Sequence, residues 1–285
     1  MKPAAFEYCQ PDTVEEALAL LHEFGQNASV LAGGLSLGAM LNMRLARPSA
    51  VVDIKRIAVL NEIFLSPEIR IGAAVTQAQA MENAALMEAV PLLALALPFV
   101  GHFQTRNRGT LCGSVAHADP SAETPLVLAT LGGEVELQSV RGKRRVPADK
   151  FFLDALTTAR EPDELVTALI CPKRKERAGC GFCELAQRHG DFAIVACAAE
   201  ALVDSRGKLT ALSFGLGGVE TRPVVVHSAG FLGHRADAAL ARTIAEESAK
   251  RVTPLHDYKA SADYRRALVR AIGARVLTEA FECAA

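Results

Sequence analysis

A pair of adjacent glycines between an apolar strand and a helix constrains this chain more than any other feature. The segment Leu31–Gly38 follows a β-prone run at Ser29–Ala32 and leads into a helical pattern over Ser36–Leu45. Consecutive glycines allow successive N–H groups to converge on one point, and the helix dipole adds positive potential there, which suits a pyrophosphate held without a lysine. Because Leu35 replaces the second glycine of G-x-G-x-x-G and no Gly-Lys-Ser/Thr follows, the segment is neither of the common nucleotide motifs. By itself, a Gly-Gly pair is more often an ordinary tight turn.

A second segment of small residues, Arg106–Ser114, precedes two acidic residues, Asp119 and Glu123. We expect a polar, glycine-containing loop followed by a helix over Pro120–Leu131. The hydroxyls and free N–H groups of the loop favour an anion, and the carboxylates favour the polyol part of a ligand. A basic solvated turn before a capped helix explains the same residues. The second loop alone is therefore ambiguous.

Hydrophobic periodicity predicts an α+β protein in two parts. A helix at Thr13–Phe24, the strand–glycine turn–helix unit and a strand at Ala50–Ile54 occupy residues 1–55. The other expected elements are strands at 68–72 and 165–171, a helix from Thr76 to Met81, a buried helix at Pro91–Val100, a hairpin joining 134–140 to 144–146, strands at 182–187, 199–203 and 209–216, and a helix-rich tail from 236. The charged stretch Pro172–Arg177 is the best candidate for a domain boundary.

Composition excludes several classes of function. The chain has 285 residues, half of them apolar, with 31 basic against 32 acidic side chains and no Trp, which removes the electrostatic and stacking basis for nucleic-acid binding. The longest apolar run, Ala89–Val100, is too short to cross a bilayer, and we expect no signal sequence. The seven cysteines are scattered and odd in number, so we expect free thiols and a cytoplasmic location.

The motifs become specific when they are taken in order. They are Ala32-Gly33-Gly34-x-Ser36-Leu37, Val52-Asp53-Ile54, Ile71-Gly72-Ala73-x-x-Thr76, Arg106-Asn107-x-Gly109-Thr110 through Glu123, Gly181-Phe182-x-Glu184, Arg188–Ala193 and Lys259–Arg266. Over nearly the whole chain, this arrangement resembles the FAD-binding (medium) subunit of the molybdenum hydroxylases, the family of xanthine dehydrogenase and aerobic carbon monoxide dehydrogenase. The resemblance implies a two-subdomain FAD-binding domain of the vanillyl-alcohol-oxidase (PCMH) type over residues 1–175, with subdomains at about 1–55 and 56–175. A C-terminal domain of a small antiparallel sheet and helices is implied over 176–285.

The resemblance also implies which residues contact FAD. Both glycine loops hold the pyrophosphate, Glu123 lies near the ribityl and ribose hydroxyls, and Leu165 and Phe192 approach the isoalloxazine ring. The complete set of expected cofactor-binding residues is Ala32, Gly33, Gly34, Leu35, Ser36, Leu37, Val100, Thr110, Cys112, Gly113, Ser114, Asp119, Glu123, Leu165 and Phe192. No catalytic acid or base and no metal ligand is expected in this chain.

Two positions depart from the family pattern. Leu35 stands where many relatives carry a polar residue, which removes one side-chain contact but leaves the backbone N–H groups. Cys112 replaces the first glycine of a Gly-Gly pair, and because a Cβ disfavours positive φ, we expect the second loop to change shape or to hold phosphate less closely. A reactive thiol near the flavin is an alternative to an unreactive small residue, which is the favoured interpretation.

The remaining patterns are weaker. Cys180 and Cys183 form a C-x-x-C pair without a second pair, so we interpret them as core thiols rather than as part of a zinc or iron–sulfur site. The basic runs Arg141–Arg145 and Lys173–Arg177 fit solvated turns, with a subunit interface as the alternative.

The function that the resemblance implies is electron transfer. In the family, a large subunit hydroxylates the substrate at a molybdenum–pterin centre, a small subunit relays electrons through two [2Fe–2S] clusters, and the FAD of the medium subunit reduces an external acceptor. We therefore expect a heterotrimer that can pair further, with no nucleic-acid or membrane partner. Two alternatives stay open: a stand-alone FAD-dependent oxidoreductase with His102, His117 or His189 as acid or base, and a non-enzymatic assembly subunit that has lost FAD. The substrate (an N-heteroaromatic ring, a purine, an aldehyde or carbon monoxide) and the acceptor are left open by this sequence.

Overall fold

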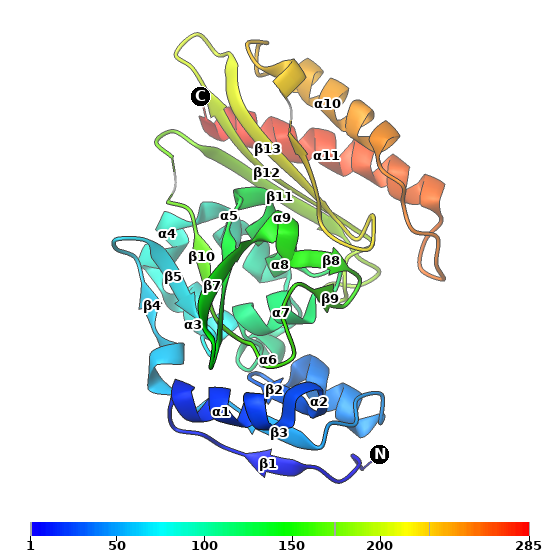
Figure 1. Cartoon of the computed structure of the whole chain (residues 1–285). Helices are drawn as coiled ribbons and strands as arrows, with labels where there is room; N and C mark the ends of the chain where they lie inside the picture. The colour runs from blue at the N-terminus through cyan, green and yellow to red at the C-terminus, as the bar shows by residue number, and fades with distance from the viewer. Residues whose placement is uncertain (1, 174, 228, 285) are drawn as a thin grey trace.

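The computed structural model describes residues 2–173, 175–227 and 229–284. Three larger sheets follow one another along the molecule, from the N-terminal sheet at one end to the C-terminal sheet at the other (Figure 1). The fold is α+β, which confirms the class that the sequence predicts. Arg174, within the charged stretch expected between domains, lies outside the described residues, and the division at residue 175 stays a prediction.

The N-terminal unit is a three-stranded parallel sheet with two helices. Its elements are the strands β1 (Glu7–Cys9), β2 (Ala28–Leu31) and β3 (Ala50–Asp53), in the order β1–β3–β2, and the helices α1 (Val14–Phe24) and α2 (Leu35–Asn42). Helix α1 begins where the Thr13 hydroxyl accepts a hydrogen bond from the Glu16 N–H, and it ends at Gly25, whose φ is +51°. These bounds confirm the predicted strand–glycine turn–helix unit. Strand β1 is an additional, largely exposed edge strand whose sequence lacks apolar alternation.

The middle unit is a five-stranded antiparallel sheet in the order β4–β5–β10–β6–β7. Its strands are β4 (Ile63–Phe64), β5 (Ile69–Gly72), β6 (Glu134–Ser139), β7 (Gly142–Pro147) and β10 (Leu165–Cys171), with a separate hairpin of β8 (Phe152–Asp154) and β9 (Thr157–Thr158). Its helices are α3 (Gln77–Glu82), α4 (Ala84–Ala89), α5 (Pro91–Ala96), α6 (Phe103–Arg106), α7 (Leu111–His117), α8 (Glu123–Leu131) and α9 (Ala148–Phe151). Every residue of the central strand β10 is buried.

Two helices of this unit are shorter than the sequence predicts. The helix predicted over Pro120–Leu131 begins only at Glu123, because Asp119 instead closes a turn by accepting a hydrogen bond from a backbone N–H two residues on. The buried helix predicted over Pro91–Val100 ends at Ala96 and continues as a 3-10 turn that contains a proline.

The C-terminal unit is a four-stranded antiparallel sheet whose strands are neighbours in chain order. Its elements are β11 (Gly179–Leu185), β12 (Val195–Val203), β13 (Leu209–Gly217) and β14 (Val224–His227), followed by α10 (Ala238–Arg251) and α11 (Ala262–Ala284). One face of the sheet packs on α5 and α8 of the middle unit, and α11 covers the other face with α10 beside it (Figure 1). No helix among the described residues is long and apolar enough to cross a bilayer.

A buried arginine joins α11 to this sheet. Arg265 is 2% exposed, and its guanidinium donates hydrogen bonds to the carbonyl oxygens of Ile194 and Gly218 and to a carboxylate oxygen of Asp257 at 2.8 Å. The acceptors lie on three separate segments. One side chain therefore sets the position of the first turn of α11 against the sheet.

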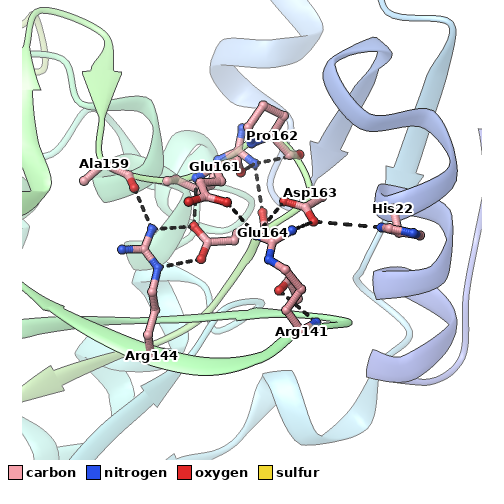
Figure 2. A network of polar contacts seen from close by, with 10 residues as sticks. His22, Arg141, Arg144, Ala159, Glu161, Pro162, Asp163 and Glu164 are labelled. Carbon is pink, nitrogen blue, oxygen red and sulfur yellow. Dashed lines mark hydrogen bonds and ion pairs between the residues drawn. The ribbon is translucent and has the colours of Figure 1, made fainter.

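The basic run Arg141–Arg145 is exposed, as the sequence predicts, but most of it lies in strand β7 rather than in a turn, and its arginines are paired with acidic residues. Arg144 donates to both carboxylate oxygens of Glu164, at 2.6 and 2.7 Å, and Arg141 pairs with Asp163 (Figure 2). Acidic residues about twenty positions later in the chain supply the partners, so local sequence does not reveal the pairing. Figure 2 labels the charged side chains of the network and two residues that contribute backbone carbonyls: His22, Arg141, Arg144, Glu161, Asp163 and Glu164, with Ala159 and Pro162.

Candidate functional site

Every residue expected to bind a cofactor lines one cleft. The cleft has a volume of about 750 Å³, within the range of about 300–1,000 Å³ that is usual for ligand sites. Its walls come from the N-terminal unit, from the middle unit, and from Gly190–Phe192 of the C-terminal unit. The predicted residues that it brings together are Ala32, Gly33, Gly34, Leu35, Ser36, Leu37, Val100, Thr110, Cys112, Gly113, Ser114, Asp119, Glu123, Leu165 and Phe192.

The first glycine loop leaves its backbone N–H groups available to a ligand. Gly34 has a φ of +76° and is the N-cap of α2, with no side-chain cap, and glycine takes this conformation without steric cost. In the described ranges, the N–H groups of Gly33, Leu35 and Ser36 have no hydrogen-bond partner. The positive end of the α2 dipole lies at the same point. This arrangement can hold an anion.

The two glycine loops touch each other. A Cβ on Gly33 would overlap the carbonyl oxygen of Arg108 and would lie 2.8 Å from the Cα of Gly109. The carbonyl of Gly109 accepts a hydrogen bond from the Gln77 N–H at 2.8 Å, so the start of α3 supports the second loop. Only a glycine at position 33 permits this approach of two backbones.

The second loop is shorter than predicted. Of the expected loop Arg106–Ser114, only residues 107–110 are outside helices, because α7 begins at Leu111. Thr110 is the N-cap, and its Oγ1 accepts a hydrogen bond from the Gly113 N–H at 3.0 Å. Gly113, which indicates a loop in the sequence, thus lies inside the first turn of a capped helix.

Cys112 does not strain this loop. It lies in α7 and is absent from the residues with positive φ, so the backbone strain expected from its Cβ does not arise. The side chain is 2% exposed, and its Sγ donates a hydrogen bond to the carbonyl oxygen of Ile71 at 3.5 Å. Burial raises the pKa of the thiol far above its ordinary value. The structure therefore supports an unreactive small side chain rather than a redox-active thiol.

A carboxyl group with a raised pKa lines the cleft. Glu123, the first residue of α8, is 5% exposed. Burial raises its pKa to about 7, and the charge of Asp119 adds to the shift, while the Glu123 backbone N–H opposes it. Near neutral pH this carboxyl group can both donate and accept hydrogen bonds, which matches a ligand rich in hydroxyl groups.

Arg160 and Gln77 are among the polar residues of the cleft that the predicted set does not include. Arg160 is the sole arginine or lysine among the described lining residues, and its Nη1 donates to three backbone carbonyls between residues 161 and 164 at 2.8 to 3.3 Å. Burial lowers its pKa, and no motif marks its position. Gln77 is 4% exposed, and its Oε1 has no hydrogen-bond partner in the part of the chain that is described. Its place directly after the Ile71–Thr76 motif is a signal that could have identified it.

The C-terminal unit closes one end of the cleft. Phe192 is 46% exposed, and the Nζ of Lys259 lies 5.9 Å from the centroid of its ring. His189, just before this segment, stacks on His102 of the middle unit with ring centroids 5.8 Å apart. The loop that carries Phe192 is thus attached to the middle unit beside the cleft.

Comparison with known proteins identifies the family. The sequence profile described as the FAD binding domain in molybdopterin dehydrogenase matches residues 4–174, and that of the CO dehydrogenase flavoprotein C-terminal domain matches residues 181–280. The chain belongs to the FAD-binding subunits of the molybdenum hydroxylases. It is an FAD-containing oxidoreductase subunit, as the motifs predict.

Two relatives of this flavoprotein subunit match over nearly their whole length. The medium subunit of nicotine 6-hydroxylase from Paenarthrobacter nicotinovorans is 35% identical over 98% of this chain and 99% of its own. The medium chain of carbon monoxide dehydrogenase from Hydrogenophaga pseudoflava is 30% identical over 99% of both chains. The crystal structure of quinoline 2-oxidoreductase from Pseudomonas putida 86 superposes with a TM-score of 0.95 at 34% identity, covering 100% of this chain and 99% of that chain.

The cleft of this flavoprotein subunit fits FAD on its own geometry. The unpartnered N–H groups of the first loop suit the pyrophosphate, and Glu123 suits hydroxyl groups. Val100 and Leu165 are buried apolar residues that line the same cleft and suit a planar ring. The unpartnered Oε1 of Gln77 adds a polar group that a ligand can satisfy.

Proposed function

We propose that this chain is the electron-transfer subunit of a heterotrimeric molybdenum hydroxylase, which receives electrons from the [2Fe–2S] clusters of a small partner subunit and passes them to an external acceptor. A large partner subunit carries the molybdenum–pterin centre and determines the substrate. The observation that carries the proposal is the single cleft formed by both glycine loops, Glu123 and Phe192. Relatives described as medium subunits or medium chains support a role inside a larger complex.

The two glycine loops would hold the pyrophosphate. The free N–H groups of Gly33, Leu35 and Ser36 carry partial positive charge, as does the N-terminal end of the α2 dipole, so together they offset the negative charge without a lysine. Contact between Gly33 and the Arg108–Gly109 backbone keeps both loops at a fixed separation. Preorganised backbone donors of this kind lower the ordering cost of binding.

Glu123 would hydrogen-bond the ribityl or ribose hydroxyls, while Val100, Leu165 and Phe192 would exclude water from the ring. Bound FAD supplies one- and two-electron redox chemistry, and the protein holds and orients it. We assign no residue of this chain the role of catalytic acid or base, because electron relay requires none. Phe192 comes from the C-terminal unit, so that unit would complete the flavin site.

Expression of the chain alone tests this proposal against the two alternatives. We expect a yellow protein with stoichiometric FAD whose chemically reduced flavin is reoxidised by an acceptor but which oxidises no hydroxylase substrate unaided. Turnover by the isolated chain would support a stand-alone oxidoreductase instead. A correctly folded chain that takes up no FAD would support an assembly subunit that has lost the cofactor.

A further inference from the structure

The strand β11 directs one carboxyl group at the FAD-binding part of the chain. A Cβ on Gly181 would overlap the backbone of Val276 in α11, so odd-numbered residues of β11 face that helix. The ring of Phe182 packs on Phe99 of the middle unit, with centroids 5.3 Å apart. Side chains alternate along a strand, so Glu184 shares the face of Phe182 and lies in the interface between the C-terminal sheet and the middle unit.

One oxygen of the Glu184 carboxyl group has no hydrogen-bond donor, in the described part of the chain, to stabilise a negative charge in this interface. Its Oε2 is shielded from solvent and has no hydrogen-bond partner among the described residues. An unpaired ionised carboxylate in such a place is costly, and the group keeps its proton instead. Glu184 does not line the cleft itself, so any effect on a ligand must act through a neighbour.

That neighbour is Glu123. Burial, with a smaller contribution from the negative charge of Glu123, raises the pKa of Glu184 to about 8. Of the other elements packed here, α5 has no titratable side chain, and α8 has no titratable side chain besides Glu123. Asp119 precedes α8 and acts on Glu123, whereas Arg275 and Glu279 of α11 act on Cys183, on the opposite face of β11.

We propose that Glu184 is a proton-holding positioning residue that stays neutral beside Glu123, so that the Glu123–Glu184 pair carries one negative charge rather than two at neutral pH. The inference rests on the proposed FAD site and adds a regulatory condition to it. With Glu184 protonated, Glu123 can ionise and accept hydrogen bonds from the cofactor hydroxyls. Once Glu184 also ionises, two like charges face each other across the interface, next to a cleft that holds an anionic cofactor.

The test is the pH dependence of FAD affinity, measured on the apo-protein by flavin fluorescence between about pH 6 and about pH 9, a range that brackets both pKa values. We compare the parent, Glu184→Gln, which is neutral at every pH, and Glu282→Gln, an exposed control on α11. By about pH 9, the parent and the control should lose about fivefold in affinity, which corresponds to a Glu184 pKa that bound FAD raises by about one unit from about 8. Glu184→Gln should lose less than about twofold over the same range.

The outcomes separate this inference from the proposed function. Absence of FAD binding by the folded parent at any pH would reject the FAD site itself. Binding by the parent that does not weaken above pH 8, or an equal loss in Glu184→Gln, would overturn the role of Glu184 while leaving the FAD site intact. Infrared difference spectra of the parent between pH 7 and pH 9 provide a second measurement that needs no variant to bind. Besides the signal of Glu123, they should show the loss of a second protonated carboxyl band that the Glu184→Gln spectra lack, and identical bands in both would also overturn the inference.

Discussion

Replacement of Gly33 by alanine tests the contact between the two glycine loops. The added Cβ would overlap the carbonyl oxygen of Arg108 and would approach the Arg108 carbonyl carbon and the Gly109 Cα at 2.8 Å each. All three atoms belong to the backbone, so no side-chain rotation relieves the overlap, and the loops must move apart. Overpacking of this kind costs about 1–3 kcal/mol.

The forced separation of the two loops should lower the affinity of the protein for FAD. If the whole cost falls on the conformation that binds the cofactor, the dissociation constant of Gly33→Ala rises by about 5- to 150-fold. Gly33→Asp adds a carboxylate to the same backbone clash and should abolish binding, because it places negative charge among the N–H groups that face the pyrophosphate. Titration of apo-protein with FAD, followed by quenching of flavin fluorescence, measures both effects.

Gly38→Ala is the matched control. Gly38 lies in α2 close to the same loop, but its added Cβ would meet open space, and alanine favours a helix over glycine. We expect parental affinity and an unchanged or slightly higher melting temperature. If Gly33→Ala binds FAD as tightly as Gly38→Ala, the contact between the loops does not shape the cofactor site and the reasoning is refuted.

Three further predictions concern residues outside this contact. Cys112 should resist a thiol reagent in the native protein while the exposed Cys283 reacts at once, and rapid labelling of Cys112 in mass spectra would contradict its burial. Arg265→Met should lower the free energy of unfolding by about 3 kcal/mol, because two buried carbonyl oxygens lose their donor; a change within experimental error in urea melts would refute this. Glu123→Gln should stabilise the apo-protein at neutral pH and above. Because the folded-state pKa of Glu123 is raised to about 7, the folded protein binds more protons than the unfolded chain between about pH 4.5 and 7, and the parent loses up to about 3 kcal/mol as pH rises through that window. Thermal melts of both proteins across it should converge at low pH and diverge at high pH, and parallel curves would count against the shifted pKa.

Residues that form turns and helix caps made much of the fold predictable. Gly33 and Gly34 lie between a strand and a helix in the structure as in the sequence pattern, and Thr13 caps α1 where polarity and periodicity place it. These features depend on a few neighbouring residues, so a single sequence carries them. The order of the motifs supports a family resemblance, and that resemblance implies that both loops, Glu123 and Phe192 belong to one site although they are far apart along the chain.

Three features were not predictable in this way, and only one of them depends on a distant residue. Gly113 indicates a loop, but the hydroxyl of Thr110 caps a helix that includes it. Arg144 is exposed, as its neighbours in the chain indicate, but the fold also brings Glu164 opposite it. Arg160 enters the cleft because three carbonyls hold its guanidinium, and none of these contacts leaves a motif in the sequence.

The most direct measurement is purification of the chain at its native level from the cells that make it, with analysis of FAD, molybdenum and iron and the masses of associated chains. We expect the chain to co-purify in stoichiometric amounts with a large molybdenum-containing subunit and a small iron–sulfur subunit. Addition of the hydroxylase substrate should then reduce the flavin bound to this chain. A chain that purifies alone, or a complex whose flavin stays oxidised while its metal centres are reduced, would contradict the proposed electron transfer.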